Sequence, residues 1–193
     1  MAVDAVVFDI GETLIDETML WERAADAAGV PRFTLMGVLG GLAARGEHHT
    51  RLWQILGIEP TNALWTFDDF YADALPCITR LQDRGYQIAA AGNTRAVAEV
   101  ELRRYFDLVA SSERWGVEKP DPRFFGHLVE EAGAPPAEIL YVGDRVDNDV
   151  LPALETGLQA VRIRRGEHAQ VDSPPGVVTI GSLTELPEVL PRG

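Results

Sequence analysis

Short apolar runs recur along the chain and predict six β-strands, over residues 5–10, 86–91, 108–110, 139–142, 160–163 and 177–180. Between most of these runs the apolar residues repeat at helical spacing, which predicts helices over residues 73–84, 94–104, 122–132, 148–156 and 183–190. Strands that alternate with helices are typical of a parallel sheet covered by helices on both faces. The pattern therefore predicts an α/β fold in which ligands bind at the edge where the strands end.

Residues 17–71 break this alternation, because they show helical periodicity and no strand-like run. Turn signals at residues 29–31, 45–46 and 59–60 divide the segment into three or four short helices. We expect residues 17–71 to form a small helical domain inserted into a core domain of residues 1–16 and 72–193. Residues 165–176 are polar and contain a Pro-Pro pair, which predicts a mobile surface loop.

The composition is that of a globular protein, with 46% hydrophobic and 24% charged residues among 193. The longest uncharged apolar run, residues 33–44, is shorter than the roughly 18 residues that a membrane-spanning helix needs. The N-terminus lacks the basic stretch of a signal peptide, and the single cysteine, Cys77, fits a reducing compartment. We therefore expect a cytoplasmic protein with no membrane partner; the sequence does not predict an oligomeric state.

The charge is strongly acidic, with a formal net value of −13. Such a surface repels nucleic acid, so no nucleic-acid partner is expected. It also repels a phosphorylated ligand at long range, but salt screens this repulsion beyond about 8–10 Å, and a local cation can then dominate inside a site. Of the 17 basic residues only Lys119 is a lysine, which makes that position a candidate for a specific role.

Carboxylates follow two of the predicted strands. Asp9 ends the first strand, Asp144 follows the strand over residues 139–142, and Asp147 and Asp149 lie in the next turn. A single aspartate at such a position does not indicate a functional site, because aspartate is common in turns and at helix starts. Together, at one edge of a parallel sheet and with Lys119 in a loop that can reach it, they suit Mg²⁺ and phosphoryl transfer.

Four ordered motifs, FDIGETL, AAGNTR, GVEKPDP and YVGDRVDND, resemble those of the haloacid dehalogenase-like (HAD) superfamily. The resemblance spans residues 6–164 and is to the branch with a helical cap inserted after the first motif. It implies a Rossmann-like core, with the inserted helices acting as a lid over the site.

The resemblance also implies a role for each matching residue. Asp9 would be the nucleophile and a Mg²⁺ ligand, and Asp144 the second carboxylate ligand. Asp149 would hold the metal through water or orient Asp144. Lys119 would steady the nucleophile and neutralise the phosphate, and Asn93 would donate hydrogen bonds to the phosphate.

The first departure from the family pattern is Gly11, where most phosphatases of the family have an aspartate that acts as general acid and base. Glycine keeps the backbone carbonyl that contacts the metal, but it lacks the carboxylate. General acid–base catalysis contributes about 10²–10⁴-fold to a rate, so the absence of this carboxylate should slow turnover. The neighbouring Glu12 is a candidate substitute, although a residue one place on points in a different direction.

The second departure is Gly92, where the family has a serine or threonine that hydrogen-bonds the phosphate. Thr94 is a candidate replacement for this donor. The alternative is that Thr94 or Asn93 caps the helix predicted to begin near Arg95.

The resemblance favours a Mg²⁺-dependent phosphatase that hydrolyses a small phosphorylated metabolite through an aspartyl-phosphate. The alternative is a degenerate family member that binds a phosphorylated ligand or partner with little turnover. A haloacid dehalogenase would use Asp9 on carbon, but that branch usually lacks the second acidic cluster. A signalling receiver domain has its acids before its lysine, whereas Asp144 and Asp149 follow Lys119.

Overall fold

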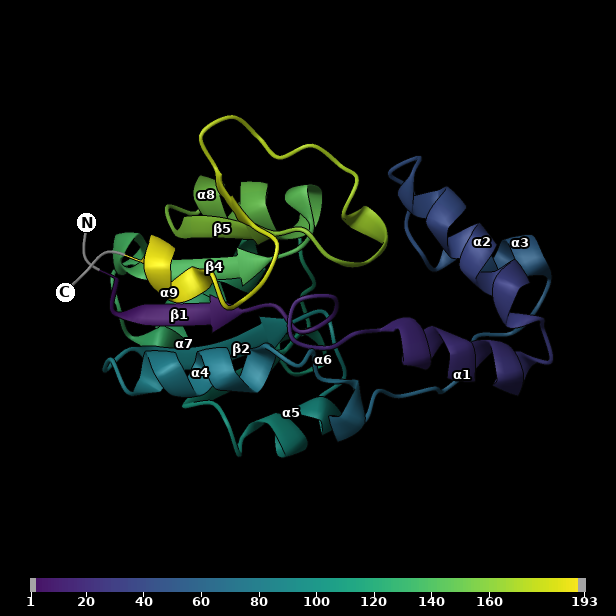
Figure 1. Cartoon of the computed structure of the whole chain (residues 1–193), viewed down its shortest axis with the longest axis horizontal. Helices are drawn as coiled ribbons and strands as arrows, with labels where there is room; N and C mark the ends of the chain where they lie inside the picture. Colours follow the sequence, from purple (N-terminus) through teal and green to yellow (C-terminus); the bar gives the residue numbers. More distant parts are fainter. Residues whose placement is uncertain (1–2, 191–193) are drawn as a thin grey trace.

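The computed structural model describes residues 3–190 and contains a six-stranded sheet (Figure 1). The strands are β1 (Ala5–Phe8), β2 (Gln87–Gly92), β3 (Leu108–Ser111), β4 (Ile139–Gly143), β5 (Gln159–Ile163) and β6 (Val178–Ile180). Their order is β3-β2-β1-β4-β5-β6, and every neighbouring pair is parallel. All six predicted strands are present, and the predicted Rossmann-like α/β fold is confirmed.

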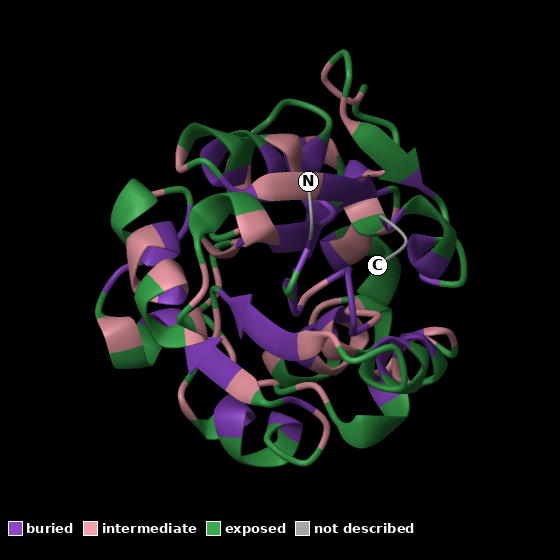
Figure 2. Cartoon of the chain, turned by 90° about the vertical axis from the view of Figure 1, so that its left-hand side faces the viewer, coloured by how far each residue is buried: buried purple, intermediate pink, exposed green. Residues whose placement is uncertain are grey.

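Alternate residues of each strand face opposite layers of helices, as the two-residue period of a strand requires. Val6 and Phe8 point into one apolar cluster, and Ala5 and Val7 point into the other. The first cluster is closed by α4 (Ala74–Gln82), α5 (Val97–Leu102) and α9 (Leu186–Val189); the second is closed by α6 (Ser112–Trp115), α7 (Pro122–Ala132) and α8 (Leu151–Glu155). Figure 2 shows the resulting layers, with buried strands at the centre and exposed outer faces on the helices.

Three local details differ from the sequence prediction. Helix α5 begins at Val97, three residues later than expected, and its first turn has no side-chain cap. The helix predicted over residues 148–156 starts as a π-helix, η3 (Val146–Val150), before α8 continues it. Helix α6 follows β3 directly, where Ser111 caps it by accepting a hydrogen bond from the backbone N–H of Arg114.

The inserted segment forms three α-helices, α1 (Thr18–Ala28), α2 (Arg32–Ala43) and α3 (Arg51–Leu56), followed by the 3-10 turn η1 (Phe67–Asp69). We call α1, α2 and α3 the cap. They bury an apolar cluster of their own, made of Trp21, Ala24, Ala25, Leu35, Leu39, Leu42 and Leu52. Figure 1 shows the cap beyond the carboxyl ends of the strands, away from both chain termini. The limits of the inserted domain at residues 17 and 71 stay a prediction.

The two connections between core and cap pair with each other. Ile15 forms an antiparallel bridge with Phe70, and the backbone N–H of Asp16 donates to the Asp69 carbonyl at 2.8 Å. The N–H of Tyr71 donates in turn to the Leu14 carbonyl at 2.9 Å. The cap is therefore attached through a short two-stranded ribbon.

The loop over residues 165–176 is tied to the core more firmly than its composition predicts. It contains a 3-10 turn, η4 (Gly166–His168). The guanidinium of Arg162 is buried in β5 and donates to the carbonyls of His168 and Val171 at 2.9 and 2.5 Å and to the Ser173 hydroxyl at 2.9 Å. The expectation of a mobile loop misses this arginine, which anchors the loop to the core.

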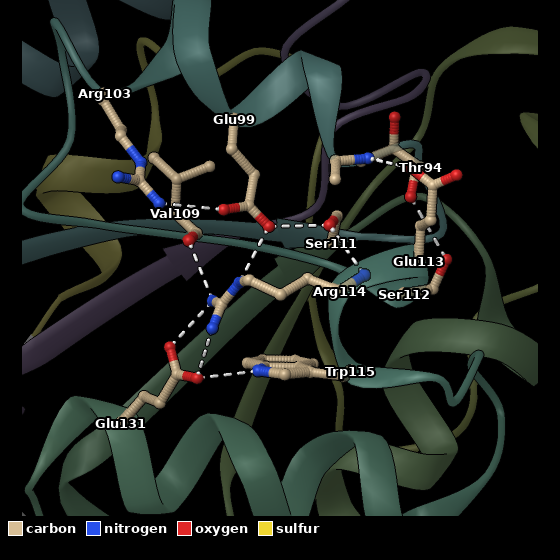
Figure 3. Close-up of polar contacts among 11 residues, drawn as sticks. Thr94, Glu99, Arg103, Val109, Ser111, Ser112, Glu113, Arg114, Trp115 and Glu131 are labelled. Atoms are coloured by element: carbon tan, nitrogen blue, oxygen red, sulfur yellow. Dashed lines mark hydrogen bonds and ion pairs between the residues drawn. The ribbon is translucent and has the colours of Figure 1, made fainter.

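A cluster of hydrogen bonds and ion pairs joins α5, β3, α6 and α7 at the β3 edge of the sheet (Figure 3). The Arg114 guanidinium lies between Glu99 and Glu131, with its Nε 2.9 Å from a Glu99 oxygen and its Nη1 2.7 Å from a Glu131 oxygen. The Ser111 hydroxyl donates to Glu99 at 2.6 Å. The Glu99 side chain is only 4% exposed, so its charge depends on these partners.

Replacing Glu99 with alanine should lower the free energy of unfolding by about 1–3 kcal/mol, because it removes the charged acceptor of Ser111 and Arg114, while Arg114 stays paired with Glu131. Hydrogen bonds from Ser111 and Arg114 outweigh burial and lower the pKa of Glu99. Its contribution is therefore full above the ordinary glutamate pKa and is lost as the pH falls through the lowered value. Urea denaturation of Glu99→Ala beside Glu101→Ala, an exposed glutamate of the same helix, measures the difference. Equal losses in the two variants would contradict this assignment.

Candidate active site

The three central strands deliver the candidate residues to one edge of the sheet. Asp9 follows β1, Asp144 follows β4 and Asn93 follows β2. Because β1 pairs with β2 on one side and β4 on the other, the strand order reverses at β1, and ligands of open α/β sheets bind at such a point. The backbone N–H of Asp9 donates to the Val142 carbonyl at 2.8 Å, which fixes the turn that presents its side chain.

Lys119 lies between two of the aspartates. Its Nζ is 2.6 Å from Asp9 Oδ1 and 2.5 Å from Asp149 Oδ1, and its side chain is 1% exposed. Burial disfavours the ammonium, but the charges of Asp149 and Asp9 outweigh it and raise the pKa of Lys119 well above its usual value. Lys119 is therefore a fixed positive charge beside the candidate nucleophile.

The carboxylates of Asp9, Asp144 and Asp149 form a group whose ligand atoms lie within 4.8 Å of one another. Burial raises the pKa of Asp9 to about 6 and that of Asp144 well above its ordinary value, and the charge of Asp149 adds to both effects. When all three are ionised, three carboxylates against one ammonium leave two negative charges without a partner in a buried site. An all-oxygen donor set with this charge fits Mg²⁺.

Two glycines make room for this arrangement. A Cβ atom on Gly143 would lie 2.5 Å from Asp149 Cβ, so a side chain there would displace Asp149. A Cβ on Gly92 would lie 2.7 Å from Asp9 Oδ1, the oxygen that Lys119 also binds. A serine or threonine at position 92 would therefore require the Asp9 carboxylate to shift from this conformation.

Asn93 contacts the backbone of Lys119. Its Nδ2 donates to the Lys119 carbonyl at 2.9 Å, and its Oδ1 accepts from the Lys119 N–H at 2.7 Å. This paired contact holds the lysine-bearing loop against the end of β2. The structure therefore gives Asn93 a positioning contact in addition to any contact with phosphate.

Thr94 lies on the wall of the cavity, and its carbonyl accepts hydrogen bonds from the Ser112 hydroxyl and from the Glu113 N–H. Neither Thr94 nor Asn93 caps α5, because the residue before that helix is Ala96. The N–H of Ala96 donates instead to a Glu113 oxygen at 2.6 Å. The capping alternative is wrong, and Thr94 stays a candidate for phosphate binding.

Glu12 is buried, and both of its carboxylate oxygens are already occupied. One accepts from the Tyr71 hydroxyl at 2.5 Å and the other from the Glu17 N–H at 3.1 Å. Burial raises the pKa of Glu12 to about 7, although the Tyr71 hydrogen bond opposes the rise. Glu12 has a φ of 51°, in the left-handed region, and its side chain lies beside Gly166 on the wall of the cavity.

Sequence reasoning missed Glu17, which stands directly before α1. It is half-buried and lines the cavity beside Asp9 and Gly11. Burial raises its pKa to about 8, and the neighbouring charges of Glu12, Glu167 and Asp9 add to the rise. The available signal was a second glutamate in the same short motif, GETLIDE, six residues after the glycine.

Core and cap together enclose a cavity of about 620 Å³. The core contributes Asp9, Asn93 and Lys119 to its wall, and the inserted segment contributes Leu20, His49 and Trp65. The volume suits a small molecule.

A parallel sheet with aspartates and a lysine at its switch point, covered by an inserted helical cap, defines a class of α/β hydrolases. The family model of the haloacid dehalogenase-like hydrolases matches residues 3–157, and the chain belongs to that family. The resemblance of the four motifs is thereby confirmed, and the protein is a HAD-like hydrolase.

Several relatives cover most of the chain. A glyceraldehyde 3-phosphate phosphatase from Methanopyrus kandleri is 28% identical over 88% of this chain and 88% of its own length. A phosphoglycolate phosphatase from Mesorhizobium japonicum is 28% identical over 100% of this chain and 98% of its own length. Among solved structures, the HAD-hydrolase YfnB from Bacillus subtilis, bound to magnesium, is 18% identical with a TM-score of 0.73 over 100% of both chains. At that identity the last comparison supports the fold alone.

Magnesium should stabilise the protein, because the buried aspartates repel one another without it. At a concentration 100 times the dissociation constant, binding adds about 2.7 kcal/mol, or a rise of about 5–10 °C in the melting temperature. The variant Asp144→Asn should melt higher than wild type without metal and lose the Mg²⁺ response. Asp147→Asn is the control, because Asp147 pairs with Arg145 and lies outside the metal group. A full Mg²⁺ response in Asp144→Asn would contradict the assignment.

Proposed function

We propose that the protein is a Mg²⁺-dependent phosphatase that hydrolyses a small phosphomonoester through an aspartyl-phosphate on Asp9. The observation that carries the proposal is the buried contact between Lys119 and Asp9, next to two further carboxylates and open to the cavity. Two relatives named as phosphatases, each matched over most of its length, support the same reaction.

In this reaction an Asp9 oxygen attacks phosphorus while the bond to the substrate oxygen breaks. Lys119 holds the nucleophile in place and offsets the charge of the incoming phosphate. Asp9, Asp144 and Asp149, with the Gly11 carbonyl, would hold Mg²⁺, which neutralises phosphate oxygens when it is bound. Asn93 keeps the Lys119 loop against the site, and Thr94, on the cavity wall, would donate a hydrogen bond to phosphate.

The substrate in this proposal is a phosphorylated metabolite small enough for the cavity, and the site is expected to work in the cytoplasm, as the single cysteine favours. No helix within residues 3–190 has the length and apolar composition needed to cross a membrane. Neither nucleic acid nor a membrane surface is expected as a partner for so acidic a chain.

Hydrolysis of p-nitrophenyl phosphate should require both Mg²⁺ and Asp9. A chelator should abolish turnover, and Asp9→Asn should lower kcat at least about 10³-fold, because the nucleophile is lost. Release of nitrophenolate measures the rate, and Asp147→Asn serves as a folded control. Unchanged turnover in Asp9→Asn would overturn the proposal. Absent turnover with retained binding of phosphorylated ligands would favour the alternative, a degenerate member that binds without catalysis.

Lys119→Arg should lose most of the activity although it preserves the charge. A planar guanidinium is bulkier than an ammonium, and the space between Asp9 and Asp149 holds a single nitrogen. We expect a fall of at least about tenfold in kcat/KM. A variant that retains more than about half of the wild-type value would show that charge alone suffices.

A further inference from the structure

The side chain missing at Gly11 is replaced in space by another carboxylate. A Cβ atom built on Gly11 would lie 2.6 Å from Glu17 Oε1 and 3.0 Å from the Glu17 carboxyl carbon. The Glu17 carboxylate therefore fills the place where a side chain at position 11 would begin. An aspartate at position 11 and the glutamate at position 17 exclude each other in this conformation.

The local structure holds Glu17 in this place. Its backbone N–H donates to a Glu12 oxygen at 3.1 Å, and its carbonyl accepts from the Trp21 N–H at 2.9 Å in the first turn of α1. Glu12 is itself held by the Tyr71 hydroxyl. Glu12, the substitute suggested by sequence, also lines the cavity, but each of its oxygens already accepts one hydrogen bond, one of them from the Glu17 N–H.

Metal binding and simple packing both account poorly for a glutamate at position 17. Glu17 is absent from the group of close carboxylates that suits a metal, which contains Asp9, Asp144 and Asp149 among residues 3–190. In the same range Glu17 forms no ion pair; its carboxylate interacts with the Trp21 side chain, and its charged neighbours are the acidic Glu12, Glu167 and Asp9. A half-buried carboxylate without a cation costs stability, so packing does not explain it.

We propose that Glu17 is the general acid and base of this enzyme, in the place of the aspartate that Gly11 lacks. The proposal rests on the phosphatase function above. In the first step Asp9 attacks phosphorus, the bond to the substrate oxygen breaks, and the Glu17 carboxyl gives its proton to the departing alkoxide, which leaves as an alcohol. In the second step Glu17 takes a proton from water as the water oxygen attacks phosphorus, the bond to Asp9 breaks and phosphate leaves.

The test compares substrates whose leaving groups differ in their need for a proton. With glycerol 2-phosphate, a poor leaving group, Glu17→Gln should lower kcat by about 10²–10⁴-fold. With p-nitrophenyl phosphate, rapid quenching should show phosphoenzyme forming at nearly the wild-type rate, followed by slow hydrolysis, which appears as a burst of one nitrophenolate per site. The matched control is Glu22→Gln, a glutamate of the same helix that pairs with Arg32 at the surface.

A second pair of variants tests whether a carboxylate at position 11 can replace the carboxylate at position 17. Gly11→Asp alone should be impaired, because its Cβ meets the Glu17 carboxylate. Gly11→Asp combined with Glu17→Ala should recover activity relative to Glu17→Ala alone, so the two substitutions should be strongly non-additive.

Wild-type kcat for glycerol 2-phosphate in Glu17→Gln would overturn the proposal, as would additive effects of the two substitutions. An equal loss on both substrates with no phosphoenzyme burst would also overturn it, since it would mean that Glu17 only supports the fold. Failure of the phosphatase function looks different, because wild type would then show no turnover of either substrate.

Discussion

One ammonium shared by two carboxylates is the interaction on which the site depends. Lys119 compensates Asp9 and Asp149 in a place where water cannot, and the paired amide contact of Asn93 fixes its backbone. Removing such a partner leaves buried charges that cost several kcal/mol, which helps explain why one lysine persists in a chain that otherwise uses arginine. The layered core holds the Lys119 loop against the carboxyl ends of β1 and β4, where Asp9 and Asp144 lie.

The sequence predicts the fold well because the strands are short and apolar, and β1 and β4 are buried along their whole length. All six were located from such runs, including β2 with its alanine-rich segment. Local details were harder to predict. The π-helical start of η3 and the short α6 involve side-chain hydrogen bonds to backbone N–H groups, from Arg145 to Asp149 and from Arg114 to Ser111, which hydrophobic periodicity does not indicate. The loop after β5 is anchored by Arg162, whose burial no periodicity indicates.

The sequence predicts those site residues that directly follow a strand. It does not predict contacts in which a side chain from one segment approaches the backbone or side chain of another. Asp9, Asp144, Asp149 and Lys119 meet as their motifs implied. The missing hydroxyl at Gly92 became understandable only when the Asp9 carboxylate was seen beside it. Glu17 could not be found from spacing alone, because its approach to Gly11 depends on the turn that Glu12 and Tyr71 stabilise.

The ribbon that joins core and cap restricts how the cap can move. Ile15 and Phe70 lie side by side, and the Arg165 guanidinium stacks 4.1 Å above the Tyr71 ring while its Nη1 donates to the Thr13 carbonyl at 3.0 Å. Because the two connecting segments are paired, they cannot move independently, and a movement of the cap relative to the core has to bend both together. Because the inserted segment supplies part of the cavity wall, any such bending would reshape the cavity and its opening at the same time.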